Sequence, residues 1–313
     1  MDFVGVDSES AATVDPTQPQ LNTECPHGAH APQAPPSVHT SSRFISKYPL
    51  HSLFYDVCFK LRHLKKQNKR HPIVADRDLP PNHSIVVPNT ETLKFIMKPE
   101  NQAPKDSVKE CSNFDVDKEL GFVSKKYDIT ALGGAFCRHG FCGVAHNVFT
   151  GERYSYALMA LYIILFQHQL PILFFWYDVN CRFKSRFSWW VDQLRNNGHN
   201  IPLEAHELRF PVPPFHINAH GPKCQEQNAH TLMEGAGRPP GEPPEIIWSK
   251  LGELGKTVQY MSRVNRQGVI ERKLAVLHNI AVDSLPALLM RMGARAVEQV
   301  KQLFCYCISE PYT

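Results

Sequence analysis

The stretch from Ala157 to Trp176 constrains the fold more than any other segment, because its twenty residues are mostly apolar. A run of this length can cross a bilayer as one helix. Here Gln-His-Gln at 167–169 interrupts the run, and Pro171 follows. Because proline breaks helices, the sequence predicts a buried helix over 153–168 followed by a buried strand over 171–177. We therefore expect a chain that does not span a membrane.

The segments around this run alternate strand and helix signals. Residues 50–59 are apolar and aromatic and predict a strand. Residues 130–149 predict two strands joined near His139–Gly140, with either a close backbone approach or a bulge at Gly133-Gly134. Further helices are expected over 184–195, from Pro243 onward, over 269–280 and over 286–303. This order of elements predicts a mixed α/β layer fold.

Composition divides the chain into a lead-in and a core. Residues 1–43 are rich in Pro, Ser, Thr, Gln and His, and are expected to be a disordered, acidic lead-in. Residues 44–313 are expected to form the core, because 42% apolar and 10% aromatic residues exclude wholesale disorder. Within this core, residues 196–241 are rich in His, Pro and Gly. They predict an insertion before a C-terminal helical part at about 243–305.

Basic residues cluster directly after the first predicted strand. The formal net charge of +4 by itself predicts no partner. Between residues 60 and 70, six bases occur without an intervening acid: Lys60, Arg62, Lys65, Lys66, Lys69 and Arg70. Such a run is either a solvated face or a surface that contacts nucleic-acid phosphates.

Two aspartates each follow a tyrosine at the end of an apolar strand. Asp56 lies near the end of the strand predicted over 50–59, and Asp178 follows the strand predicted over 171–177. Desolvating a carboxylate costs free energy unless a cation or hydrogen bonds compensate it, and ligand sites of open α/β sheets gather at strand ends. Each aspartate is therefore either the cap of a turn or a ligand of a divalent metal ion.

Glu242 and Glu245 supply a third carboxylate. They are three residues apart at the start of a predicted helix, whose N-terminus favours anions. Two aspartates and a glutamate on separate elements are the ligand set of two-metal phosphoryl-transfer nucleases, which use Mg²⁺ or Mn²⁺. We favour Glu245 as the third ligand, because a position within the helix gives its side chain a fixed direction.

The cysteines argue against a secreted disulfide framework. There are nine of them, an odd number, and no apolar signal segment precedes them. This pattern favours free thiols or metal ligands in a reducing compartment. Two groups of side chains could supply ligands for Zn²⁺: Cys137, His139 and Cys142 in the predicted hairpin, and His216, His220 and Cys224 in the predicted insertion. The alternative is that these side chains are hydrogen-bonded or exposed without a metal.

Five segments, in order along the chain, resemble the catalytic core of the Kyakuja–Dileera–Zisupton (KDZ) transposases. They are Tyr55-Asp-Val-Cys-Phe-Lys-Leu61, Cys137-Arg-His-Gly140 with Gly151-Glu-Arg-Tyr-Ser-Tyr156, Tyr177-Asp-Val-Asn-Cys181, Phe215-His-Ile-Asn-Ala-His-Gly-Pro-Lys-Cys-Gln225 and Gly237-Arg-Pro-Pro-Gly-Glu-Pro-Pro-Glu-Ile-Ile-Trp-Ser249. Arg263 and Asn279 follow these segments in the same resemblance, and together they span residues 50 to about 280, nearly all of the expected core.

The resemblance implies a ribonuclease-H-like fold and DDE-type transposition chemistry. Asp56 stands where the family has its first catalytic aspartate and Asp178 where it has its second. Glu242 and Glu245 stand in the family's Gly-Glu-x-x-Glu element. The resemblance also implies Mg²⁺ or Mn²⁺ as cofactor, transposon ends and target DNA as partners, a homo-oligomer, and the nucleus as compartment.

Two functions remain open at this point. The family's upstream cysteine-cluster module is missing from this chain, so we expect a truncated core. Acids at all three catalytic positions favour an active transposase core that cleaves DNA and transfers strands. The truncation favours a non-catalytic relic that binds DNA or a protein partner.

Overall fold

The structure is a computed structural model, and it describes residues 50–65, 85–102, 126–167, 172–198, 207–237, 239 and 242–309. The four candidate carboxylates, Asp56, Asp178, Glu242 and Glu245, all lie within these ranges. The lead-in expected over 1–43 lies outside the described residues, as do three members of the basic run, Lys66, Lys69 and Arg70.

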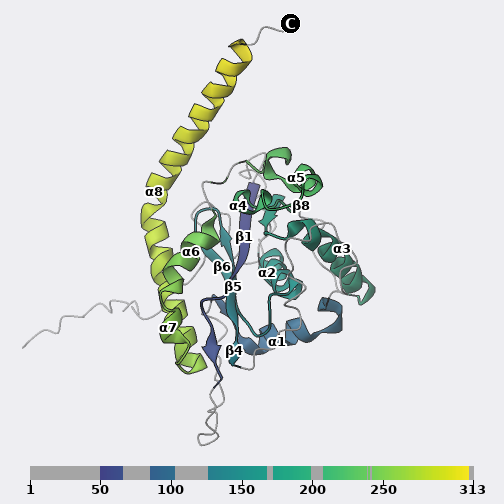
Figure 1. The fold of residues 1–313 in the computed structure, drawn as a ribbon, viewed down its shortest axis with the longest axis vertical. Helices are drawn as coiled ribbons and strands as arrows, with labels where there is room; N and C mark the ends of the chain where they lie inside the picture. Colours follow the sequence, from purple (N-terminus) through teal and green to yellow (C-terminus); the bar gives the residue numbers. More distant parts are fainter. Residues whose placement is uncertain are drawn as a thin grey trace, which may run out of the picture.

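Six strands form one mixed sheet in the order β3-β6-β5-β1-β7-β8 (Figure 1). The central strand β1 pairs antiparallel with β5 and parallel with β7. Beyond these, β6 is antiparallel to β5, β3 is parallel to β6, and β8 is parallel to β7. A second sheet pairs β2 with β4. The bounds are β1 Leu50–Cys58, β2 His63–Leu64, β3 Val86–Val87, β4 Tyr127–Ile129, β5 Ala131–Cys137, β6 Cys142–Val148, β7 Ile172–Trp176 and β8 Glu207–Arg209.

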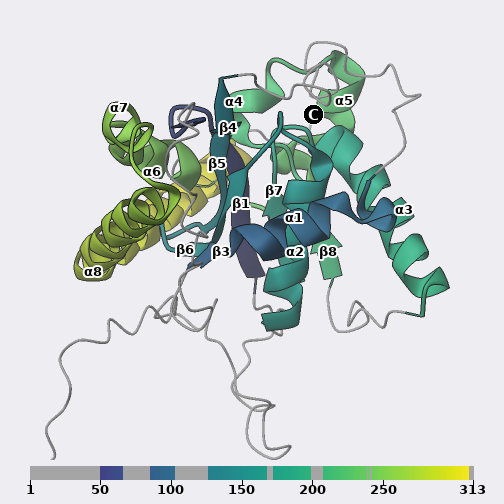
Figure 2. The ribbon, with the colours of Figure 1, turned by 90° about the horizontal axis from the view of Figure 1, so that it is seen from below.

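Helices cover both faces of the large sheet. Helices α1, α2 and α3 lie on one face, and α6, α7 and α8 lie on the other (Figure 2). The C-terminal half of α8 extends past the body of the molecule (Figure 1). The bounds are α1 Asn89–Met97, η2 Pro99–Asn101, α2 Tyr154–Gln167, α3 Asn180–Asn196, α4 Pro214–Ile217, α5 Pro222–Asn228, η5 His230–Leu232, α6 Pro243–Gly252, α7 Gly255–Val258 and α8 Arg263–Ser309.

Alternate residues of strand β1 pack on the two faces of the large sheet. Leu53, Tyr55 and Val57 belong to the core shared with α2 and α3, whereas Cys58 belongs to the core that contains Trp248 of α6. Successive side chains of a strand point to opposite faces. Asp56 therefore lies on the face covered by α6, and this geometry lets α6 contribute to the same site.

Most predicted elements are confirmed. The strand expected over 50–59, the hairpin over 130–149 and the helix beginning at Pro243 are all present. The apolar stretch from 157 to 176 is divided between α2 and β7, as predicted. Among the described helices, α8 alone is long and apolar enough to cross a membrane. A single helix that meets only these two criteria is weak evidence of a membrane span.

Helix α3 begins at Asn180, four residues before the predicted start at 184. The Asn180 side chain explains the earlier start. Its Nδ2 donates hydrogen bonds to the carbonyl oxygens of Phe175 (2.6 Å) and Pro211 (2.7 Å). These two bonds fix the chain directly after β7. The sequence pattern did not indicate this role, because the segment Asp178-Val-Asn180 is polar and lacks a helical repeat of apolar residues.

Helix α8 is continuous where two helices, over 269–280 and 286–303, were predicted. Pro286 lies inside it and removes one backbone donor. The neighbouring Leu285 is buried, in a cluster that also contains Phe141 of the β5–β6 connection. We infer that this packing holds the helix together across the proline.

The segment 196–241 contains regular structure, although the sequence predicted an irregular insertion. Strand β8 lies within it and forms an edge of the large sheet, and the short helices α4 and α5 follow. A strand of three residues is too short for its pattern to be distinguished from a loop.

Gly133 permits the closest backbone approach in the hairpin. A Cβ at this position would lie 2.4 Å from Cε1 of His146 and 3.1 Å from Oη of Tyr55. Both side chains are buried, and the Tyr55 hydroxyl and His146 Nε2 share a hydrogen bond of 3.2 Å. Of the two alternatives predicted at this glycine pair, the close approach is present at Gly133, and the register shift of the hairpin lies further on, between Ala135 and Phe136.

Replacing Gly133 by Ala should lower the free energy of unfolding by about 1–3 kcal/mol, because the buried His146 ring would have to move. Gly268→Ala is the matched control. Gly268 lies in α8 and has no atom within 4 Å of a Cβ, so this change should raise the free energy by roughly 0.5–1 kcal/mol. Denaturant unfolding followed by circular dichroism measures both. Unchanged stability of Gly133→Ala would contradict the described packing.

Candidate functional site

Neighbouring parallel strands bring the two aspartates together. Strands β1 and β7 pair in a register that places Phe54 opposite Trp176. Two residues further along each chain, this register sets Asp56 beside Asp178. Adjacent strands lie about 4.8 Å apart. The two segments with the order aromatic residue, tyrosine, aspartate are therefore aligned side by side at the ends of β1 and β7.

The two aspartates line a small recess between the sheet and the start of α6. Glu242 and His216 also line it, and we call these four residues the acidic recess. Its volume is about 10 Å³, which is about the space that one water molecule occupies. Three acids and one histidine from four separate segments thus meet at one point.

Helix α6 contributes in two ways. Trp248 Nε1 donates a hydrogen bond of 2.8 Å to Oδ2 of Asp56. Glu242 is the N-cap residue of α6 and is 5% exposed. Its Oε1 accepts a hydrogen bond of 2.9 Å from the backbone N–H of Phe215. Glu245 lies one turn further on with an exposed side chain, although its charge still acts on Asp56.

Burial and mutual repulsion disfavour the ionised form of both aspartates. Burial, with a further contribution from the charge of Asp178, raises the pKa of Asp56 to about 7. Burial also raises the pKa of Asp178, and the charge of Glu242 raises it further. His216 opposes that rise. A cation placed between the carboxylates would relieve this repulsion.

The side chain of His216 is positively charged at neutral pH. Its Nε2 lies 3.3 Å from Oε2 of Glu242. This hydrogen bond is the main cause that raises the pKa of His216 to about 9, and the charge of Asp178 adds to it. The imidazolium therefore offsets part of the negative charge and holds the Glu242 carboxylate in place.

The donor atoms of the recess suit a hard divalent cation. Oδ1 of Asp178 is buried and has no hydrogen-bond partner among the described residues. Buried polar atoms almost always have a partner, so this oxygen is available to a bound ion. Carboxylate oxygens are the ligands that Mg²⁺ and Mn²⁺ prefer. Asp56, Asp178 and Glu242 could hold such an ion.

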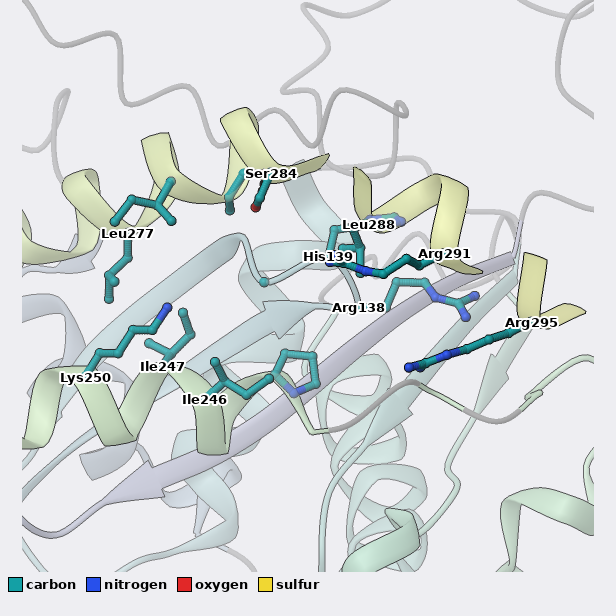
Figure 3. A pocket seen from close by; sticks show the side chains of 14 residues that line it. Arg138, His139, Ile246, Ile247, Lys250, Leu277, Ser284, Leu288, Arg291 and Arg295 are labelled. Atoms are coloured by element: carbon teal, nitrogen blue, oxygen red, sulfur yellow. Dashed lines mark hydrogen bonds between the residues drawn. The ribbon is translucent and has the colours of Figure 1, made fainter. Parts of the chain in front are cut away.

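A groove with basic side chains lies close to the acidic recess. Arg138 of the β5–β6 turn, Lys250 of α6, and Arg291 and Arg295 of α8 line a cavity of about 310 Å³ (Figure 3). We call these four residues the basic groove. A second cavity of about 780 Å³ shares Arg138 and Arg295 with it and extends to Glu242. Glu242 therefore lines both this second cavity and the acidic recess.

The described part of the predicted basic run lies elsewhere. Lys60 packs against Gly252 and Gly255, at the C-terminal end of α6. The guanidinium carbon of Arg62 is 5.3 Å from the centre of the Tyr127 ring. Lys65 follows β2. Lys60 and the acidic recess are therefore at opposite ends of α6.

The zinc ligands predicted in the hairpin lie on two faces of the sheet. Cys137 and His139 are close together, with Sγ and Nδ1 3.8 Å apart, and Cys137 belongs to the core with α2 and α3. Cys142 belongs to the opposite core, which contains Trp248. The structure therefore does not bring these three side chains to one point.

The zinc ligands predicted in the insertion also separate. His216 lies in the acidic recess. His220 and Cys224 lie together, and the third member of their group is Cys181 of α3. The ligand atoms of these three residues are all within 4.8 Å of one another.

Sequence reasoning assigned no role to Trp248, Cys181 or the arginines of the basic groove, and it placed His216 with a different metal. A weak signal existed for two of them. Trp248 lies three residues after Glu245 in the predicted helix, and Cys181 lies three residues after Asp178. The groove arginines gave no signal, because their segments meet only in the folded chain.

A mixed sheet that brings strand-end aspartates and a helix-cap glutamate into one recess defines an α/β protein with a clustered carboxylate site. A family model described as Kyakuja-Dileera-Zisupton transposase (KDZ) matches residues 51–276. This match covers well over half of the chain, which therefore belongs to the KDZ transposase family. Searches of curated proteins and of solved structures found no match.

Proposed function

We propose that this chain is a DNA transposase core that cleaves phosphodiester bonds and transfers strands with a metal-binding carboxylate triad. The observation that carries the proposal is the meeting of Asp56, Asp178 and Glu242 in the acidic recess. Membership of the KDZ family supports DNA as the substrate. The nucleus, where such DNA lies in a eukaryotic cell, is the compartment that we propose.

The proposal includes a ribonuclease-H-like fold, which the arrangement of the sheet supports. Strands β6, β5 and β1 form an antiparallel set, and β7 and β8 continue from β1 in parallel. The first aspartate lies on the central strand and the second at the end of its parallel neighbour. Both acids therefore lie toward the carboxyl ends of these two neighbouring strands, and in this proposal DNA reaches them once the recess opens.

The third carboxylate is Glu242 in this proposal, with Glu245 as the alternative. Glu242 lines the recess and is fixed by hydrogen bonds from the backbone of Phe215 and from His216. Glu245 is exposed but close enough for its charge to raise the pKa of Asp56. A conformational change on DNA binding would be needed to bring Glu245 into the recess.

In this proposal the residues of the acidic recess hold and orient divalent ions. When bound, divalent ions activate the attacking water or 3′-hydroxyl and stabilise the departing oxygen. Asp56 and Asp178 supply the hard ligands, and Trp248 orients Asp56 through its Nε1 hydrogen bond. His216 keeps the Glu242 carboxylate oriented. Because the recess has a volume of only about 10 Å³, it must open to admit two ions and a phosphate.

The basic groove is the path that we propose for DNA. Lys250, Arg291 and Arg295 are exposed, and the groove continues to Glu242. Side chains of this kind bind phosphates and release counterions. A DNA strand that follows them from α8 would arrive at the acidic recess.

Replacing Arg291 and Arg295 together by Gln should weaken DNA binding and reduce the slope of log K against log salt by about 2, one for each lost phosphate contact. Arg272→Gln, at an exposed position of α8 outside the groove, should leave the slope unchanged. Fluorescence anisotropy with labelled DNA at several salt concentrations measures this. If Lys60→Gln with Lys65→Gln changes the slope and the groove variant does not, the basic run is the contact surface.

Nicking of supercoiled DNA by the full chain tests the function. We expect cleavage in Mg²⁺ or Mn²⁺, none in a chelator, and a loss of at least about 10³-fold in Asp178→Asn, because several kcal/mol of transition-state stabilisation disappear. Asp192→Asn, an exposed acid of α3, is the control and should retain activity. DNA binding without cleavage under all metal conditions would reject the proposal and favour the non-catalytic relic.

A further inference from the structure

A second cluster of ligand-bearing side chains lies beside the acidic recess. It consists of Cys181 in the first turn of α3, His220 between α4 and α5, and Cys224 in α5. Nδ1 of His220 lies 3.3 Å from Sγ of Cys224 and 3.7 Å from Sγ of Cys181. All three ligand atoms lie within 4.8 Å of one another.

These separations match those around a tetrahedral zinc ion. With Zn–S bonds of about 2.3 Å and Zn–N bonds of about 2.0–2.1 Å, sulfur and nitrogen ligands are about 3.5 Å apart. Both sulfurs approach the same nitrogen atom, Nδ1 of His220. One ring nitrogen has either one proton to donate or one lone pair to accept with. The approach of both sulfurs to this one nitrogen is the arrangement that a shared metal ion produces.

The surroundings of the cluster favour a thiolate and a fixed imidazole. Asn228 Nδ2 donates a hydrogen bond of 3.3 Å to Sγ of Cys224, and Lys184 Nζ donates one of 2.9 Å to Oδ1 of the same Asn228. Gln225 Nε2 donates a hydrogen bond of 2.7 Å to the backbone carbonyl oxygen of His220. Outer contacts of this kind orient metal ligands and tune their basicity.

We propose that Cys181, His220 and Cys224 bind one zinc ion, with a water molecule in the fourth tetrahedral position. Soft thiolate and imidazole ligands select Zn²⁺ over the hard ions that suit the acidic recess. The site therefore differs in chemistry, as well as in place, from the carboxylate cluster. It also differs from the two zinc groups that the sequence suggested, since Cys181 was in neither.

The zinc ion would join α3 to the segment that contains α4 and α5. Cys181 lies three residues after Asp178, and His220 lies four residues after His216. The ion would thus fix the backbone on both sides of the acidic recess. This positioning role rests on the proposed function, whereas zinc binding itself does not.

Metal analysis of the purified full chain tests the site. We expect about one zinc ion per chain, since thiolate and imidazole ligands favour Zn²⁺, and a value near zero in Cys224→Ser and in His220→Ala. His220→Cys supplies a third thiolate and should retain zinc. Cys137→Ser is the control at a cysteine outside the cluster and should keep the wild-type content.

Cobalt substitution keeps the test decisive if the serine variants fail to fold. Co²⁺ added to metal-free wild-type chain should give intense thiolate-to-cobalt charge-transfer absorption in the near ultraviolet. Three results would overturn the site: negligible zinc with no cobalt–thiolate band, full zinc content in Cys224→Ser, or a Cys181–Cys224 disulfide in the peptide map. None of these measurements uses DNA, so their failure is distinct from failure of the nicking assay.

Discussion

Replacing Asp56 by Asn should abolish Mg²⁺-dependent nicking and, at pH 8, make the metal-free chain more stable than the wild type. The activity should fall by at least about 10³-fold, because the ion loses a ligand at the reacting centre. The variant keeps an oxygen that can accept the hydrogen bond from Trp248 Nε1. The change therefore removes a charge while preserving the shape of the recess.

The gain in stability follows from the pKa of Asp56. Its folded value is about 7, against an ordinary value of 3.8. Between these two pH values the folded chain binds more protons than the unfolded chain, so stability falls as the pH rises. Above pH 7 the whole of this loss of folding stability is present. We expect Asp56→Asn to raise the free energy of unfolding by about 1–3 kcal/mol, less than the full shift implies because the group is partly solvated.

Added Mg²⁺ should reverse this order of stability. An ion that binds only the folded chain stabilises it by mass action. We expect Mg²⁺ to raise the melting temperature of the wild type at pH 8, to do so less at pH 5, and to leave Asp56→Asn nearly unchanged. Thermal unfolding with and without Mg²⁺ measures this, with Asp192→Asn as control. A metal-free Asp56→Asn chain that is less stable than the wild type at pH 8 would contradict the account.

Replacing Glu242 by Gln should reduce nicking by about 10³-fold, whereas Glu245→Gln should reduce it by less than about 10-fold. The reason is that Glu242 lines the acidic recess and Glu245 is exposed. Both variants are isosteric and lie three residues apart, so each is the other's control. The opposite ranking would show that Glu245 is the third carboxylate and that α6 moves when DNA binds.

A second readout separates a direct role of Glu242 from general damage. The pKa of His216 is raised to about 9, chiefly by its hydrogen bond to Glu242. In Glu242→Gln this pKa should fall, and in Glu245→Gln it should change little. Titration of the His216 ring by nuclear magnetic resonance measures both. A His216 pKa that does not respond to Glu242→Gln would contradict the described pairing.

The sequence pattern was sufficient for elements with strong periodicity and insufficient for contacts between distant segments. The strand ends that carry Asp56 and Asp178 could be predicted, because apolar runs precede both. Their alignment could not, since it depends on the register that pairs Phe54 with Trp176. Glu242 lies before the helix and so has no helical direction of its own. Its place is set by the backbone N–H of Phe215.

The same limit explains the metal ligands and the basic residues. His220 and Cys224 are neighbours in sequence and could be paired by spacing, whereas Cys181 joins them only through folding. The basic run was conspicuous because its six members lie within eleven residues without an intervening acid. The groove arginines, Arg138 and Arg295, come from a turn and a helix that are distant in sequence.

Diffraction from crystals of the full chain soaked in Mn²⁺, recorded near the manganese absorption edge, tests the central claim most directly. The account predicts an anomalous peak between the carboxylates of Asp56 and Asp178, within coordination distance of Glu242 or Glu245. It also predicts loss of that peak in Asp178→Asn crystals. A wild-type map at saturating Mn²⁺ with no peak between the two aspartates would contradict it.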